Sequence, residues 1–169
     1  MEKELRINDK IKYLFIGTFF SWEFFILLIC ILFLWGRWGE VWIVEHLSWV
    51  KSAEWLNEVL KIIFVGPFYW YWLVFKTYQP LTRVEFVEQK HYVNWKYFPI
   101  VKLYHKISCY WCLFCGIASV SSLLIAKGEI SYITLVICVG ANLISWKSFE
   151  STKLAADAKD EIYQKYSVQ

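Results

Sequence analysis

The amino-acid sequence predicts an all-α membrane protein: four transmembrane helices, an interfacial outer helix and a helical cytoplasmic tail. Apolar residues make up 58% of the 169 positions, and they gather in four runs, each long enough to cross about 30 Å of hydrocarbon. A soluble domain needs a larger share of polar residues to cover its surface. The net charge of +3 is too small to indicate a nucleic-acid partner.

The predicted spans divide the chain into a four-span membrane bundle, residues 1–149, and an amphipathic helical tail, residues 150–169. We expect the second span to kink at Gly66-Pro67, because proline lacks a backbone N–H and clashes with the preceding turn. The four spans cover residues 13–35, 60–78, 107–126 and 130–149.

Basic residues are unevenly distributed among the segments that connect the spans. Four precede the first span, two lie in residues 36–59, and five lie in residues 77–106. Because basic segments stay on the cytoplasmic side, both chain ends are predicted in the cytoplasm. Lysine outnumbers arginine 15 to 3, a compositional hint of an AT-rich bacterial, plasmid or phage gene, so the expected location is a bacterial inner membrane.

Two connecting segments are expected to contact the membrane surface. The inner loop, residues 79–106, mixes basic and aromatic side chains, and anionic lipid is its simplest partner. The outer segment, Val41 to Leu60, has helical periodicity and several tryptophans, which favour the headgroup layer. That outer helix either fixes the depth of the bundle or offers a surface to a partner protein.

The tail carries an apolar stripe with a four-residue repeat, and it is predicted to continue the fourth helix. Such a stripe favours docking, either within the chain or on a second subunit. The candidate partner-facing residues of the outer helix and the tail are Trp42, Trp49, Trp55, Ile162 and Tyr166.

Small residues recur every three or four positions along the third and fourth spans. Small side chains let helix backbones approach closely in lipid, and the three-residue turn between these spans makes the helices antiparallel neighbours. The sequence therefore predicts one packed seam, with Asn142 beside it and hydrogen bonded across it. The seam residues are Ser108, Cys112, Cys115, Ser119, Ser122, Thr134, Cys138, Ala141 and Ser145.

All five cysteines fall within predicted spans, which excludes an extracytoplasmic disulfide under this topology. Cys109, Cys112 and Cys115 form a CxxCxxC sequence that resembles the start of an iron–sulfur run. The fourth position is Ser119, however, and a continuous helix separates Cys109 from Cys115 by about 9 Å along its axis. Packing is the favoured interpretation, and neither a metal nor a cofactor is expected.

Glu23 is the one charged residue inside the first span. A charge there costs roughly 2.5–3.5 kcal/mol on insertion scales, so we expect it to face the bundle, hydrogen bonded or protonated, with no basic side chain at its depth. Two roles remain open for Glu23: it fixes helix packing, or it carries protons in a small exporter. The candidate partners are Asn142, Thr134, Tyr69 and Tyr71.

The chain has no nucleophile–base pair, nucleotide-binding loop or metalloprotease motif, so no catalytic residue and no enzymatic activity are expected. In size and topology it resembles colicin-type immunity proteins, phage superinfection-exclusion proteins and plasmid exclusion proteins, although no motif carries this likeness. The resemblance implies a protein that blocks DNA or toxins by binding an incoming phage, plasmid or toxin protein, or a host membrane protein. Alternatives are a proton-coupled transporter or channel subunit using Glu23, and an accessory subunit of a membrane complex.

Overall fold

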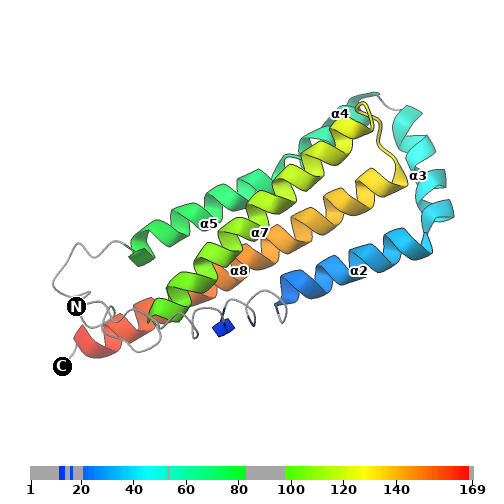
Figure 1. The fold of residues 1–169 in the computed structure, drawn as a ribbon. Helices are drawn as coiled ribbons and strands as arrows, with labels where there is room; N and C mark the ends of the chain where they lie inside the picture. The colour runs from blue at the N-terminus through cyan, green and yellow to red at the C-terminus, as the bar shows by residue number, and fades with distance from the viewer. Residues whose placement is uncertain (1–11, 14–15, 17–20, 53, 83–97, 168–169) are drawn as a thin grey trace.

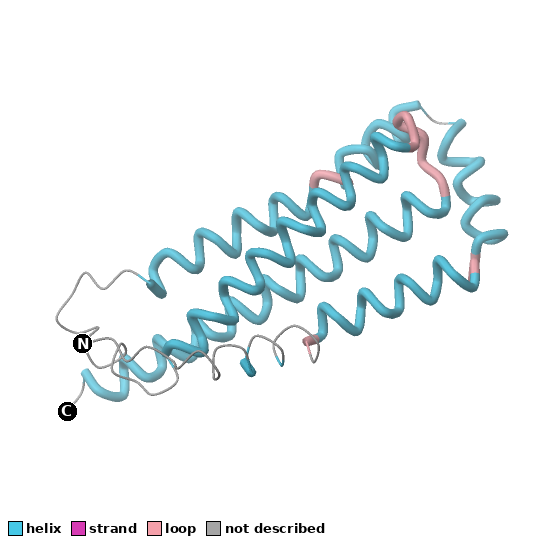
Figure 2. Tube along the Cα trace, in the orientation of Figure 1, coloured by secondary structure: helices cyan, strands magenta, loops and turns pink. Residues whose placement is uncertain are grey.

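The computed structural model describes residues 12–13, 16, 21–52, 54–82 and 98–167, and every regular element among them is helical. This confirms the all-α part of the predicted fold for the described residues (Figure 2). Figure 1 shows the long helices side by side, with the helix of residues 40–52 across one end. The helices are α2 (Trp22–Gly36), α3 (Glu40–Ser52), α4 (Glu54–Ile63), α5 (Gly66–Thr82), α7 (Phe98–Ile125) and α8 (Tyr132–Ser167).

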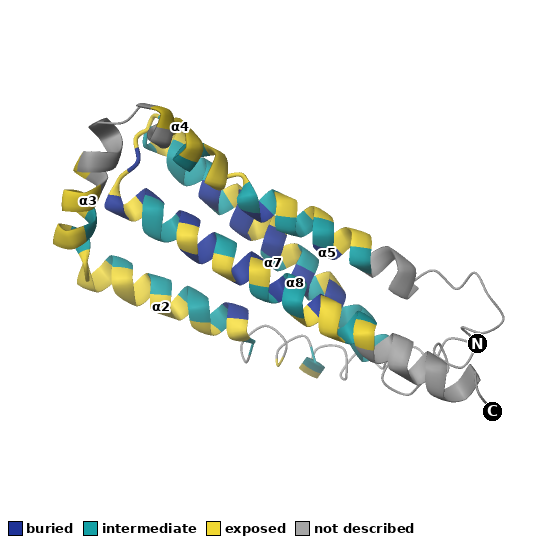
Figure 3. Ribbon diagram, turned by 180° about the vertical axis from the view of Figure 1, so that it is seen from behind, coloured by how far each residue is buried: buried dark blue, intermediate teal, exposed yellow. Residues whose placement is uncertain are grey.

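Helices α5, α7 and α8 pack against one another and form the core of the bundle, whereas α2 packs along α8. Buried residues line the facing sides of the core helices, while much of α2 and α3 is exposed (Figure 3). At Gly140 the two helices α2 and α8 approach closely, because a Cβ there would collide with the Cys30 thiol.

Within the described residues, three helical stretches are long and apolar enough to cross a membrane: Glu58–Thr77, Pro99–Ile125 and Tyr132–Asp157. A fourth span is present if Trp22–Gly36 and Glu40–His46, which are bent by 87° relative to each other, count as one unit. By length and composition the chain is therefore compatible with a multi-pass membrane protein of three or four spans.

The first predicted span, residues 13–35, is not one straight helix. Ser21 has an extended backbone, with φ −89° and ψ 156°, and its side chain caps α2 by accepting a 3.2 Å hydrogen bond from the N–H of Phe24. The 15 residues of α2 rise only about 22 Å, less than the roughly 30 Å of a hydrocarbon layer. Serine is a preferred N-cap residue. Ser21 therefore makes α2 begin at Trp22, well after the predicted start of the span at residue 13, and a hydropathy scale does not detect such a cap.

The predicted kink of the second span is confirmed as a break between α4 and α5. Helix α4 ends at Ile63, the next two residues form a turn, and α5 begins at Gly66. Pro67 thus occupies the first turn of α5. Backbone N–H groups in a first turn have no acceptor within the helix, so the absence of an N–H at Pro67 costs α5 no hydrogen bond.

The predicted outer helix over residues 41–60 is two helices, and only α3 lies crosswise, because α4 leads into α5 (Figure 1). The chain turns into α3 at Arg37, which has a left-handed backbone with φ 49°. Tyr132 secures this corner. Its hydroxyl lies 2.8 Å from the carbonyl oxygens of both Phe33 and Trp38, and donates its proton to one of them at a time.

Helices α7 and α8 are longer than the predicted third and fourth spans. Helix α7 begins at Phe98 rather than at residue 107, and α8 runs without interruption to Ser167. Their rises of about 42 and 54 Å exceed an apolar layer of roughly 30 Å. The predicted inner loop, residues 79–106, is consequently wrong at both ends. Its first residues belong to α5 and its last to α7, while residues 83–97 lie outside the described residues.

Candidate functional site

The carboxylate of Glu23 is the centre of the candidate site. It lies in the first turn of α2, is 6% exposed, and accepts a 3.0 Å hydrogen bond from the hydroxyl of Ser148 on α8. Negative charge is favoured in the first turn of a helix, where backbone N–H groups converge. A hydroxyl donor and a helix terminus together offset the loss of water around this carboxylate.

Ser148 is not among the partners predicted for Glu23. The small-residue spacing that predicts the seam along α8 continues beyond Ser145 to Ser148 and then to Thr152, both of which are buried. That periodicity therefore contained the signal for the true partner. The four predicted partners, which are wrong, were Asn142, Thr134, Tyr69 and Tyr71.

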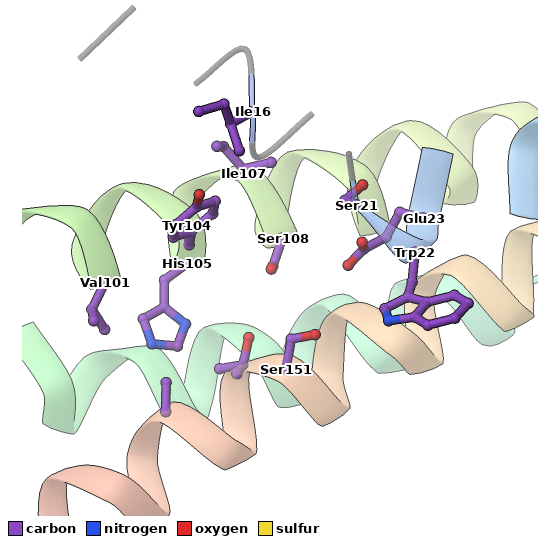
Figure 4. Close-up of a pocket in the computed structure, with 12 residues that line it drawn as sticks. Ile16, Ser21, Trp22, Glu23, Val101, Tyr104, His105, Ile107, Ser108 and Ser151 are labelled. Carbon is purple, nitrogen blue, oxygen red and sulfur yellow. The ribbon is translucent and has the colours of Figure 1, made fainter. Parts of the chain in front are cut away.

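A half-open cavity of about 330 Å³ adjoins Glu23 between α2, α7 and α8. In Figure 4 the Glu23 carboxylate projects into this space from α2, and the side chains of His105 and Ser108 project from α7 toward α8. The polar residues that line it are Ser21, Glu23, Tyr104, His105, Ser108, Ser151 and Thr152.

His105 was missed as a residue of this cavity. The structure places His105 on α7 in the same cavity as Glu23, with 3% of its surface exposed. The cause is the early start of α7, which brings residues 98–106 into the bundle. The only signal was a histidine two positions before the apolar run, which a hydropathy window leaves out.

The cavity lies toward the end of the bundle opposite α3. At 1.5 Å per residue, Glu23 is about 20 Å from the end of α2 that adjoins α3. His105 is about 30 Å from the corresponding end of α7. An apolar layer of roughly 30 Å that begins at α3 therefore contains Glu23 and ends near His105.

The predicted seam residues lie between adjacent helices, since α7 and α8 pack directly against each other. The thiol of Cys112 donates to the backbone carbonyl of Ser145 across this contact at 3.7 Å. All five cysteines are free thiols, and no group of three metal-ligating side chains is found in the described part of the chain. The buried seam residues are Ser108, Cys112, Cys115, Ser119, Thr134, Cys138, Ala141 and Ser145, with Ser122 half-buried.

Asn142 compensates for the break at Pro67. Because Pro67 has no N–H, it cannot bond the carbonyl of Ile63 four residues earlier. The side-chain amide of Asn142 donates to that carbonyl at 3.2 Å and to the carbonyl of Cys138 at 2.9 Å. Gly66 leaves room for it, since a Cβ there would collide with Asn142 Oδ1. Asn142 thus bonds the end of α4, and not across the α7–α8 seam as predicted.

The partner-facing candidates that can be placed are exposed. Trp42 on α3 and Trp55 on α4 have 62% and 69% of their surface exposed. The rings of Trp42 and His46 are in contact, with their centroids 4.1 Å apart and their planes tilted by 30°. The remaining candidates belong to α3 and α8, but their side chains lie outside the described residues: Trp49, Ile162 and Tyr166.

No protein-family model, curated protein sequence or solved structure matches this chain.

We expect Asn142→Leu to lower the free energy of unfolding by about 1–3 kcal/mol, because the Ile63 carbonyl then lacks a donor in apolar surroundings. In a Pro67→Ala background the same replacement should cost less, since alanine restores the missing backbone N–H. Thermal unfolding of the four proteins in detergent micelles, followed by circular dichroism, measures this coupling. An equal cost in both backgrounds would contradict the assigned role.

Ser148→Ala should also destabilise the bundle, by about 1–3 kcal/mol, because it leaves a buried carboxylate without its hydroxyl donor. Ser151→Ala is the matched control, since Ser151 lies on the same helix and is exposed. Both variants are compared with the parent chain by the same unfolding measurement. Equal stability of the Ser148 variant and the control would show that the Glu23 contact contributes nothing.

Proposed function

We propose that this chain is a multi-pass protein of a bacterial inner membrane that acts by binding another membrane protein. Its activity is of the exclusion or immunity type: it blocks the passage of DNA or a toxin, and both of its ends lie in the cytoplasm. The observation that carries the proposal is the placement of α3, which crosses one end of the bundle (Figure 1), together with the exposed Trp42 and Trp55.

The exposed surface supports the membrane setting. Large apolar side chains point outward on three of the long helices: Ile29 on α2 is 53% exposed, Trp72 on α5 is 51% exposed, and Phe114 on α7 is 58% exposed. Soluble monomers rarely expose so much apolar surface. A lipid environment removes its contact with water.

The packing favours binding over a self-contained transport path. Helices α5, α7 and α8 are mutually packed, and α2 flanks them through α8. The cavity beside Glu23 lies on one side of this core. Exposed tryptophans at the end of such a bundle suit an interface, because tryptophan contributes large contact area and is enriched among interface hot spots.

Challenge of bacteria that express this chain tests the proposal. Conjugating donors, injecting phages and pore-forming toxins are applied in parallel, with an empty-vector control. We expect a drop of orders of magnitude in transfer or killing for one class of invader, with normal adsorption or mating-pair formation. Combined Trp42→Ala and Trp55→Ala replacement should weaken that protection at least tenfold. Trp72 is also exposed but lies midway along α5. Its replacement by alanine should therefore leave the protection intact when the variant is equally abundant in the membrane.

Protection against none of these invaders would contradict the proposed activity. Protection that survives loss of both tryptophans would instead show that α3 and α4 are not the binding surface.

The buried carboxylate and its cavity favour a second candidate, a small proton-coupled transporter or channel subunit. Under this hypothesis Glu23 exchanges a proton for a cation, as a carboxylate in an apolar setting can. Glu23→Gln should then abolish proton and cation flux in vesicles that contain the protein. Intact flux would exclude this candidate.

A further inference from the structure

The formal charge lining the cavity is negative. Glu23 is the only Asp, Glu, Lys or Arg residue among the described residues that line it. The nearby lysine of α8, Lys147, is paired with Glu150 instead. A buried carboxylate that lacks an ionic partner attracts a cation, because the pair recovers part of the desolvation cost.

The walls of the cavity suit a cation that also carries hydrogen-bond donors. Oε1 of Glu23 already accepts from Ser148. Thr152 donates its proton to the carbonyl of Ser148 at 2.8 Å, so its hydroxyl oxygen retains lone pairs for an incoming donor. Ser108 adds a further hydroxyl from α7, as Figure 4 shows. A primary ammonium group has three N–H donors, which matches this set of acceptors.

The rest of the lining is apolar and aromatic, and it suits an organic substituent better than a hydrated metal ion. Val101, Ile107 and Ala155 contribute aliphatic surface, and Trp22 and Tyr104 contribute rings. Aromatic faces attract ammonium groups through cation–π contacts. The volume of about 330 Å³ falls at the lower end of the range for small-molecule sites.

We propose that this cavity binds a primary ammonium group, through the Glu23 carboxylate. Two sources have this chemistry, a free organic amine and the headgroup of an amine-bearing lipid. Both can reach the site, since the cavity is half-open and extends from Glu23 to the border of the apolar layer near His105. The proposal goes beyond the exclusion role, because Trp42 and Trp55 lie toward the opposite end of the bundle.

The purified full chain in maltoside micelles tests this site directly, without any measurement of transport or exclusion. One arm titrates phenylethylammonium chloride by calorimetry. The other adds equal amounts of phosphatidylethanolamine and phosphatidylglycerol, and native mass spectrometry measures which lipid is retained. We expect saturable one-to-one binding in at least one arm, weakened at least tenfold by Glu23→Gln. Binding in the first arm identifies a free amine as ligand, and preferential retention of phosphatidylethanolamine identifies a lipid headgroup.

Glu150→Gln is the matched control, since Glu150 is an accessible carboxylate on α8 outside the cavity, and it should bind like the parent chain. Ala155→Leu fills the cavity without changing any charge and should also weaken binding at least tenfold. This variant tests the proposal even if the Glu23 variant fails to fold. The proposal is overturned if neither probe binds, or if binding is unchanged in folded Glu23 and Ala155 variants. It is also overturned if the amine does not bind and phosphatidylglycerol is retained as well as phosphatidylethanolamine.

Discussion

Wherever the structure describes an interruption in another helix of the bundle, a polar side chain of α8 lies against it. Tyr132 reaches the carbonyl groups at the corner between α2 and α3, Asn142 reaches the carbonyl freed by Pro67, and Ser148 reaches Glu23 in the first turn of α2. In apolar surroundings an unbonded polar group costs several kcal/mol. At these three places, α8 provides the hydrogen-bond donor for a bend, a break or a buried carboxylate in a neighbouring helix.

This arrangement divides the bundle into a packed core and a less integrated flank. Helices α5, α7 and α8 support one another, whereas α2 depends on α8. Its polar attachments are a hydroxyl at each end, from Tyr132 and Ser148, with the close approach at Gly140 between them. Ile26 and Leu27 add apolar packing against the buried cluster of Cys115, Ala141 and Ile144. The crosswise α3 and the cavity lie near the two ends of α2. Both candidate binding surfaces thus border the less integrated flank, and functional elements of proteins are commonly found in such less stable parts.

Much of the architecture followed from patterns that act over many residues. Apolar runs predicted the long apolar helices α7 and α8, the small-residue spacing predicted which of their faces are buried, and Pro67 predicted the break before α5. Features set by single hydrogen bonds were not predictable in this way. The cap at Ser21 shortens α2, and neither hydropathy nor spacing assigns a partner to Asn142. His105 was missed because a polar residue inside a long helix is invisible to a window that averages hydropathy.

The contact between Glu23 and Ser148 joins residues 125 positions apart, and this separation has a consequence for synthesis. Translation proceeds at about 5–20 residues per second, so roughly 6–25 s pass between the addition of the two residues. For most of that interval α2 has been made, but Ser148, its hydrogen-bond partner on α8, has not. The carboxylate therefore requires water or lipid headgroups as temporary hydrogen-bond donors. An intermediate that buries α2 before Ser148 is available therefore carries the cost of an unbonded carboxylate.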